Sequence, residues 1–83
     1  MPEQNQRDAQ RPPHTAHGLR RTLAQNVRAE RERQEQSQEQ LAEAAGLTQQ
    51  YLSDVERAKR NVSVDAIGRL ADALHVKASR LFD

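Results

Sequence analysis

The sequence predicts an all-α fold, a compact domain of five short helices. Hydrophobic residues recur three and four positions apart in successive segments, which is the spacing of one helix face. Serine or threonine precedes several of these segments, where an N-cap residue is expected. No segment shows the alternating pattern of a half-buried strand. At 83 residues, the chain is expected to form one small domain.

The composition favours a small aliphatic core. Hydrophobic residues make up 35% of the chain and aromatic residues 2%, so Leu, Val and Ala must fill that core. Cysteine is absent, which excludes disulfides and thiolate chemistry and fits a reducing cytoplasm. No apolar run approaches membrane-spanning length, and no signal peptide is visible. We therefore expect a cytoplasmic location and no membrane partner.

The first 18 residues are expected to form a disordered tail, because they are polar and contain all three prolines of the chain. From residue 19 the pattern changes to an amphipathic stripe, carried by Leu19, Leu23 and Val27. The folded domain is therefore predicted to span 19–83, with a first helix over 19–34.

Two short helices, over 38–45 and about 49–57, are predicted to flank a tight turn. Ser37 begins a capping-box pattern before the first helix, and Thr48 is placed as the N-cap of the second. Gly46 stands where the first helix must end in a left-handed conformation. The inward faces carry small or apolar residues, namely Leu41, Ala42, Ala45, Leu47, Leu52 and Val55. This order and spacing indicates a helix-turn-helix, which lays its second helix into the DNA major groove.

The rest of the chain is predicted to complete the core. After a loop over 58–62, Ser63 is expected to cap a fourth helix. Its predicted buried stripe is Val64, Ile67, Leu70, Ala71 and Leu74. A turn near 75–76 leads to a last short helix that holds Leu81 and Phe82.

Residues 19–83 resemble the phage-repressor and Cro-type helix-turn-helix family of transcription regulators. The resemblance lies in the segments 37–42, 45–47, 51–57, 60–63, 70–74 and 81–82. The segments 51–57 and 60–63 are also similar to the small controller proteins of restriction–modification systems. The resemblance implies a compact five-helix, lambda-repressor-like domain that binds duplex DNA, usually as a two-fold homodimer on a palindromic operator. We therefore expect a sequence-specific transcription regulator that reads the major groove with helix 48–57.

The chain departs from the family pattern at three turns. Glu35 and Gln36 stand where glycine and a large apolar residue are common, and Ala58 stands where glycine is common. If Ala58 is left-handed, its side chain is expected to cost about 1 kcal/mol. Lys77 stands where a capping serine or threonine is common. These departures concern stability more than function, because none removes a DNA-facing residue.

Four residues of the second motif helix are candidates for base contacts: Gln49, Gln50, Ser53 and Asp54. The N-terminal residues of a recognition helix face base edges, and a glutamine amide suits N6 and N7 of adenine. Gln49 is expected to make this contact, and Gln50 to reach a neighbouring base or a phosphate. Asp54 either accepts from cytosine N4, forms an ion pair or deters wrong sequences. The alternative for both glutamines is a purely solvating role.

Phosphate contacts are expected from the ends of the two motif helices, namely from Gln38, Thr48, Tyr51, Arg57, Lys59 and Arg60. The cations after the second helix would fix the register and supply affinity without sequence preference. The Tyr51 ring is expected at the edge of the core, with its hydroxyl toward a phosphate or its ring near a thymine methyl. The resemblance suggests that the Gln38 amide holds a phosphate and braces Gln49.

Two further sets of contacts are expected within and between protomers. The resemblance suggests an ion pair between Arg31 and Glu56, for which we expect partial burial. Dimerisation is predicted to use the apolar residues near the C-terminus, Leu74, Val76, Leu81 and Phe82. The alternative is that these four residues only close the core of the monomer.

The sequence gives little support to other functional classes. The three histidines, His14, His17 and His75, show no helical metal spacing, and there is no phosphate-cradling glycine loop. We therefore expect no enzyme activity, metal or cofactor. The main competitor is a protein-interaction module of the same fold, an antitoxin or adaptor with a protein partner. An ordinary helical hairpin without a DNA role is the other alternative.

Overall fold

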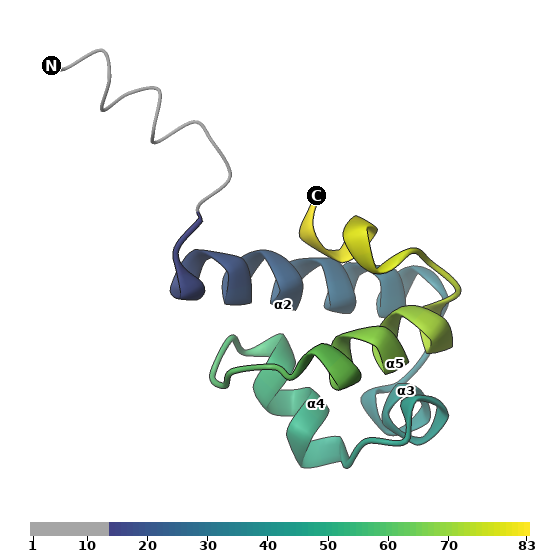
Figure 1. Ribbon diagram of the computed structural model, residues 1–83. Coiled ribbons are helices and arrows are strands. Elements are labelled where there is room, and N and C mark those ends of the chain that lie inside the picture. Colours follow the sequence, from purple (N-terminus) through teal and green to yellow (C-terminus); the bar gives the residue numbers. More distant parts are fainter. Residues whose placement is uncertain (1–13) are drawn as a thin grey trace, which may run out of the picture.

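The computed structural model describes residues 14–83 and is all-helical over that range (Figure 1). Four α-helices are followed by one 3₁₀ helix: α2 (Ala16–Arg33), α3 (Gln38–Ala45), α4 (Gln49–Glu56), α5 (Val64–Leu74) and η1 (Ala78–Phe82). The all-α prediction is therefore confirmed. The fifth helix of the prediction is present as a 3₁₀ helix rather than an α-helix.

The first helix begins earlier than the sequence predicted. The Thr15 hydroxyl accepts a hydrogen bond from the Gly18 backbone N–H at 3.0 Å and so caps α2 at Ala16. Gly18 is buried within the first turn of this helix rather than lying in a tail. The predicted boundary at residue 18 therefore lies within α2, because the Thr15 cap starts the helix before the apolar stripe begins at Leu19. The rest of the predicted tail, residues 1–13, lies outside the described range.

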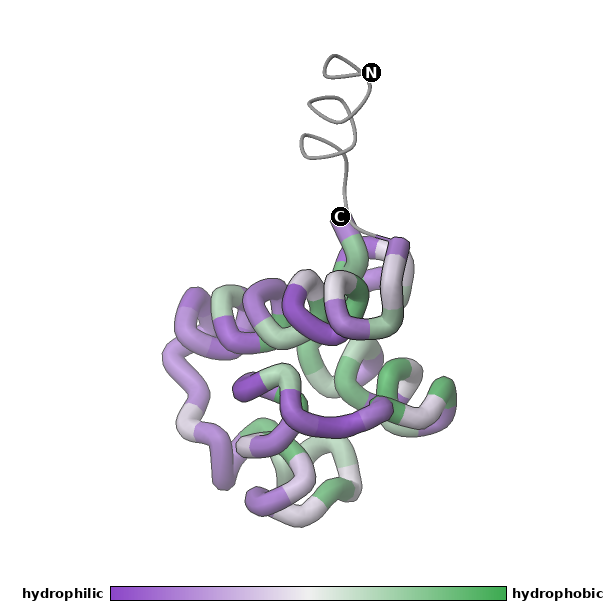
Figure 2. Tube along the Cα trace, turned by 90° about the vertical axis from the view of Figure 1, so that its left-hand side faces the viewer, coloured by the Kyte–Doolittle hydropathy of each residue, from purple (hydrophilic) through white to green (hydrophobic). Residues whose placement is uncertain are grey.

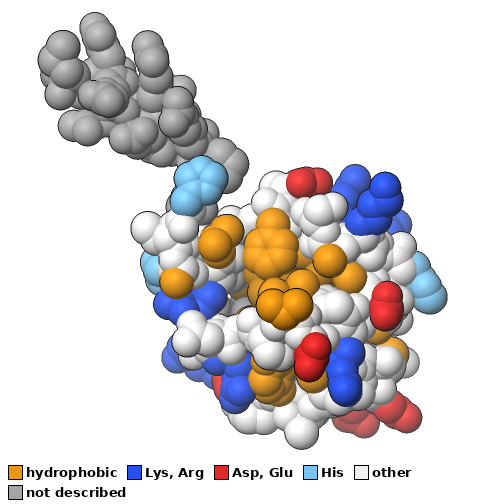
Figure 3. Space-filling model, viewed as in Figure 1, with side chains coloured by type: hydrophobic (Ala, Val, Ile, Leu, Met, Phe, Trp, Pro, Cys, Tyr) orange, Lys and Arg blue, Asp and Glu red, His pale blue; other side chains and the backbone are white. Residues whose placement is uncertain are grey.

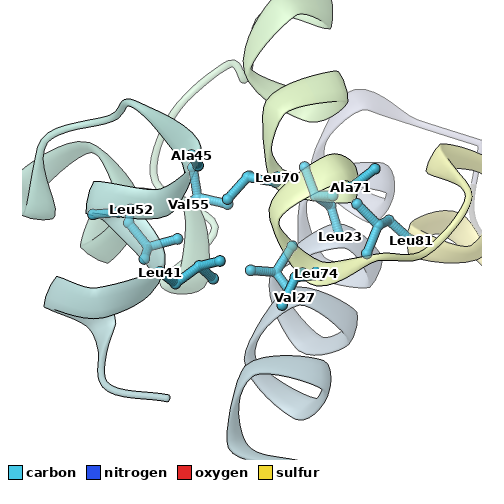
Figure 4. Close-up of a cluster of buried hydrophobic side chains, with 11 residues drawn as sticks. Leu23, Val27, Leu41, Ala45, Leu52, Val55, Leu70, Ala71, Leu74 and Leu81 are labelled. Carbon is cyan, nitrogen blue, oxygen red and sulfur yellow. The ribbon is translucent and has the colours of Figure 1, made fainter. Parts of the chain in front are cut away.

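The core draws at least one residue from every helix (Figure 4). Its fully buried members are Val27, Leu41, Leu52, Val55, Leu70, Leu74 and Leu81. Two residues of the predicted stripes lie outside it, since Leu19 is 40% exposed and Val64 is 83% exposed. Both lie in the first turn of their helices, where neighbouring elements cover Leu19 only in part and leave Val64 largely exposed.

The turn between α3 and α4 is fixed by backbone hydrogen bonds. Gly46 is left-handed with a φ of 68°, and the following Leu47 N–H donates to the Ala42 carbonyl at 2.8 Å. The Thr48 hydroxyl then accepts from the Tyr51 N–H at 3.0 Å and starts α4. Because α3 ends and α4 begins within three residues, the angle between the two helices is determined locally.

The remaining helices hold this pair in place. α2 packs against α4 and η1, while α5 packs against α3 and η1. The inner side of α4 is closed by Leu52 and Val55, which are 0% and 1% exposed. Figure 2 shows the loop that follows α4 as a hydrophilic stretch across the near side of the molecule. The side of α4 that lies opposite Leu52 and Val55 faces the solvent.

Candidate nucleic-acid interface

Two glutamine side chains stand at the exposed N-terminus of α4. Gln49 and Gln50 are the first two residues of the helix, directly after the Thr48 cap, and both are exposed. Ser53 lies one turn further along and is half-buried. The buried side of α4 faces the core, so these amide groups project away from the body of the protein. An amide can donate and accept at once, which is the chemistry that a base edge presents.

The partly exposed Asp54 side chain is paired with other side chains of the protein rather than left free for a ligand. One carboxylate oxygen accepts from Gln50 Nε2 at 3.0 Å, and the other accepts from Arg60 Nη2 at 3.1 Å. Hydrogen bonding to Arg60 lowers the pKa of Asp54 below its ordinary value. Of the roles expected for Asp54, the structure shows the ion-pair partner.

Arg60, predicted as a phosphate contact, is also engaged within the chain. Its guanidinium carbon lies 4.2 Å from the centroid of the Tyr51 ring, a cation–π distance. The Tyr51 ring packs against the core, and its hydroxyl accepts from the Ser63 N–H at 3.3 Å. The two residues therefore brace the loop between α4 and α5. Arg20 supports the same loop from α2 by donating to Asn61 Oδ1.

A second network joins α2, α3 and α4. Arg31 Nε and Nη2 donate to the two carboxylate oxygens of Glu56 at 2.7 and 3.0 Å, and Nη1 donates to the Gln36 carbonyl at 2.8 Å. The Arg31 and Glu56 side chains are 12% and 3% exposed. Hydrogen bonding to Glu56 raises the pKa of Arg31. The bidentate pair thus fixes the end of α4 to the body of the protein.

Gln38 belongs to this network and does not brace Gln49 as the resemblance suggested. Its Nε2 donates to Glu56 Oε1 at 3.1 Å, so the amide nitrogen is turned toward the end of α4 rather than its beginning. Gln38 is half-buried at the first position of α3, behind the Ser37 cap. Its amide oxygen and the backbone N–H groups of the first helical turn remain the groups suited to a phosphate.

A basic surface flanks the exposed side of α4. The Arg57 and Lys59 side chains are exposed and form no hydrogen bond or ion pair with other residues in the range 14–83. Arg57 shares a shallow groove with His17, Arg21 and Gln25 of α2. These α2 residues were not among the DNA contacts predicted from the sequence, although their spacing of four places them on one helix face. The groove thus collects positive charge next to the candidate reading helix.

The predicted dimer residues divide into two kinds. Leu74 and Leu81 are 0% and 1% exposed in the single chain, so their assignment to an interface is wrong. Both close the core between α5, η1 and the other helices. Val76 and Phe82 are half-buried and keep some apolar surface. Phe82 lines an apolar groove with Leu19, Leu23, Val62 and Ile67, and Figure 3 shows hydrophobic side chains gathered in the middle of this face.

The geometry defines a class of protein. Two short helices cross at a glycine turn, the second presents polar side chains to the solvent, and exposed cations flank it. This is a helix-turn-helix unit. A model of the family described as Helix-turn-helix matches residues 27–81, and the chain belongs to that family of transcription regulators. None of the helices in the range 14–83 is both long enough and apolar enough to span a membrane.

Similar proteins include two control proteins and a transcription factor of comparable length. The control protein C.SmaI of Serratia marcescens is 43% identical over 63 residues, which cover 76% of this chain and 75% of that protein. The structure of the restriction-modification controller protein C.AhdI from Aeromonas hydrophila has a TM-score of 0.74 at 40% identity, over 76% of this chain and 96% of that one. The structure of the hypothetical transcription factor NHTF from Neisseria has a TM-score of 0.78 at 38% identity, over 88% of this chain and 83% of that one. Two other matched regulators are longer, and the chain spans 40% of their length.

Proposed function

We propose that this protein is a cytoplasmic transcription regulator that binds an inverted-repeat operator in duplex DNA as a two-fold homodimer. The observation that carries the proposal is the pair of exposed amides, Gln49 and Gln50, at the capped N-terminus of α4. In this position a recognition helix meets the base edges of the major groove. The similarity to controller proteins and a transcription factor supports this reading and does not favour the interaction-module alternative.

Base reading is assigned to Gln49 first. Its side chain has no internal partner among residues 14–83, so both its oxygen and its nitrogen are free for a base. An amide that accepts from N6 and donates to N7 selects adenine. Ser53 lies on the same exposed side and can reach a neighbouring base through its hydroxyl.

Affinity without sequence preference is assigned to the basic surface. Arg57 and Lys59 are exposed next to the C-terminal end of α4, where the sugar–phosphate strand leaves the groove. Each neutralised phosphate releases condensed counterions, so binding weakens as the salt concentration rises. The N-terminus of α3 at Gln38 offers backbone N–H groups to a phosphate on the other strand.

The dimer surface is assigned to the apolar groove that contains Leu19, Val62, Ile67 and Phe82. Leu19 is 40% exposed, and the groove remains open in the single chain. A two-fold contact that buries it would remove this apolar surface from water. A two-fold dimer presents its two recognition helices about 34 Å apart, one turn of DNA, and so selects an inverted repeat.

The test is selection from random duplexes followed by sequencing of the bound pool. The wild-type protein should enrich an inverted repeat, and Gln49→Ala should lose about 1–3 kcal/mol of discrimination at one base pair of each half-site. Asp72→Ala, which removes an exposed polar side chain from α5, serves as the control and should leave the base preference unchanged. If Gln49→Ala weakened binding to all sequences equally, Gln49 would not read a base.

The basic surface is tested by salt titration of the selected duplex. Arg57→Gln should flatten the plot of log affinity against log salt by about one unit for each phosphate that the arginine neutralises. Its base preference should stay that of the wild-type protein, because a phosphate carries no sequence information. An unchanged slope would remove Arg57 from the phosphate-binding surface.

A further inference from the structure

Asp54 places a carboxylate on α4, within the surface that we assign to DNA binding. Asp54 lies one turn beyond Gln50 on α4, and its side chain is 20% exposed. A free carboxylate that faced the phosphates would repel them and oppose binding. In this protein, one oxygen of Asp54 accepts from Gln50 and the other from the positively charged Arg60, which offsets the charge of the carboxylate.

Arg60 is itself fixed from more than one side. Its Nη2 donates to Asp54 at 3.1 Å, and its guanidinium carbon lies over the Tyr51 ring, 4.2 Å from the centroid. Its Nε is buried without a hydrogen-bond partner among the described residues. Tyr51 is held in turn by the Ser63 N–H and the core. The ion pair and the ring contact together restrain the guanidinium, which in turn restrains the Asp54 carboxylate.

The chain of contacts ends on the exposed amide of Gln50. Asp54 accepts from Gln50 Nε2 at 3.0 Å, which decides which end of the amide is the nitrogen. One Nε2 hydrogen is used in this bond, while the second hydrogen and both lone pairs of Oε1 remain free. Gln49, the neighbouring amide, has no such support within residues 14–83. The two glutamines are thus exposed alike but constrained differently.

We propose that Asp54 and Arg60 are positioning residues that hold the Gln50 amide for one base pair, with its oxygen ready to accept from the adenine N6 amino group. The remaining Nε2 hydrogen would then donate to adenine N7. Because the amide is already oriented, binding loses less side-chain entropy than binding by a free glutamine. The positive charge of Arg60 also offsets the negative charge of Asp54, so the pair as a whole repels the phosphates little. This inference rests on the proposed function, since it names which residues prepare a base contact.

The experiment compares base preferences of the full chain and its variants in the random-duplex selection. Gln50→Ala should lose about tenfold to hundredfold discrimination at one base pair, the fold-change expected for a bidentate contact. Asp54→Ala and Arg60→Met should relax the preference at that same base pair. The double variant Gln50→Ala/Asp54→Ala should lose no more discrimination at this base pair than Gln50→Ala alone. Gln49→Ala, which removes an unsupported amide, should affect a different base pair. Arg33→Met, which breaks an exposed ion pair with Glu30 on α2, should leave the motif unchanged.

Helical circular dichroism first verifies that each variant is folded, and Arg60→Lys replaces Arg60→Met if the latter is not. A lysine keeps the charge but not the planar contact with Tyr51, so it too should relax the preference. The positioning role is overturned if Asp54→Ala changes a different base pair from Gln50→Ala, or if both partner variants leave the Gln50 preference intact. If the wild-type protein enriches no motif, the proposed function fails, and this inference fails with it.

Discussion

At the scale of single residues, the structure separates side chains that are exposed for a ligand from those engaged within the fold. Gln49, Arg57 and Lys59 are exposed and without side-chain partners in the described part of the chain. Arg60 and Gln38 carry equally suitable chemistry, yet their donor groups are engaged by Asp54 and Glu56. A residue type that suits DNA is therefore not enough, because an internal partner can take the same hydrogen bonds.

The Arg31–Glu56 pair should contribute strongly to stability. Arg31→Met would leave the Glu56 carboxylate, 3% exposed, with only the Gln38 amide as a side-chain hydrogen-bond partner. Removing one partner of a buried ion pair costs about 3–5 kcal/mol. Urea unfolding of the variant measures this loss, with Arg28→Met as the control, because the Arg28–Glu32 pair is 63% and 56% exposed. An unchanged unfolding midpoint for Arg31→Met would show that the pair is unimportant.

Ala58 has the strained left-handed backbone conformation that its place after the second motif helix suggested. Its φ is 57°, in the left-handed region that glycine occupies at least cost. Ala58→Gly is expected to stabilise the protein by about 1 kcal/mol, measured as a higher free energy of unfolding in urea. Ala44→Gly provides the opposite control, since this exposed alanine is helical in α3 and the change should destabilise by about 0.5–1 kcal/mol. A loss of stability in Ala58→Gly would contradict the strain.

At the scale of elements, local signals determine where the motif helices begin and end. The Ser37, Thr48 and Ser63 hydroxyls each accept from a backbone N–H three residues on, as their positions predicted. Gly46 ends α3 in the left-handed conformation. The η1 segment lacks a side-chain cap at Lys77, and it forms a 3₁₀ rather than an α-helix. These features belong to short stretches of backbone, so the sequence displays them directly.

The turn between α3 and α4 should be the most sensitive element to a single methyl group. At Gly46 a Cβ would be forced into a left-handed backbone and would lie 3.0 Å from Arg69 Nη1. Gly46→Ala is therefore expected to cost about 1–2 kcal/mol and to weaken DNA binding by shifting α4. Gly68→Ala is the matched control, because a Cβ there meets nothing within 4 Å inside α5. That variant should be about 1 kcal/mol more stable in urea unfolding, as alanine favours a helix; equal effects of the two changes would contradict the argument.

At the scale of the whole molecule, four helices and η1 leave two different surfaces on the described part of the chain. One surrounds the exposed side of α4 and is polar and basic. The other is the apolar groove on the face shown in Figure 3, which we assign to a second copy of the chain. A regulator that reads an inverted repeat needs both, since affinity for each half-site is combined only when two domains are joined.

The assignment of the apolar groove can be tested through the oligomeric state. Leu19→Glu places a charge in the groove at a position that is 40% exposed, so the fold should survive while the dimer weakens by at least about tenfold. Sedimentation equilibrium measures the change, and Ala44→Glu on the exposed side of α3 is the control. Affinity for the inverted repeat should fall with the dimer, while binding to a single half-site should not. A dimer of unchanged stability would place the interface elsewhere.

The sequence by itself determined the two motif helices, their Ser37 and Thr48 caps and the glycine turn between them, because each depends on residues a few positions apart. It also placed Gln49 and Gln50 at the start of the reading helix. It did not reveal the Thr15 cap that starts α2 three residues before the predicted helix. Only the tertiary structure decided which side chains are free. Leu74 and Leu81 are covered, whereas Val64 is not, because coverage depends on how α5 and η1 pack against the rest. The Arg31–Glu56 pair spans 25 residues and was expected only through the family resemblance, while the Gln38–Glu56 contact spans 18 residues and was not expected, because no local pattern reports a contact over such separations.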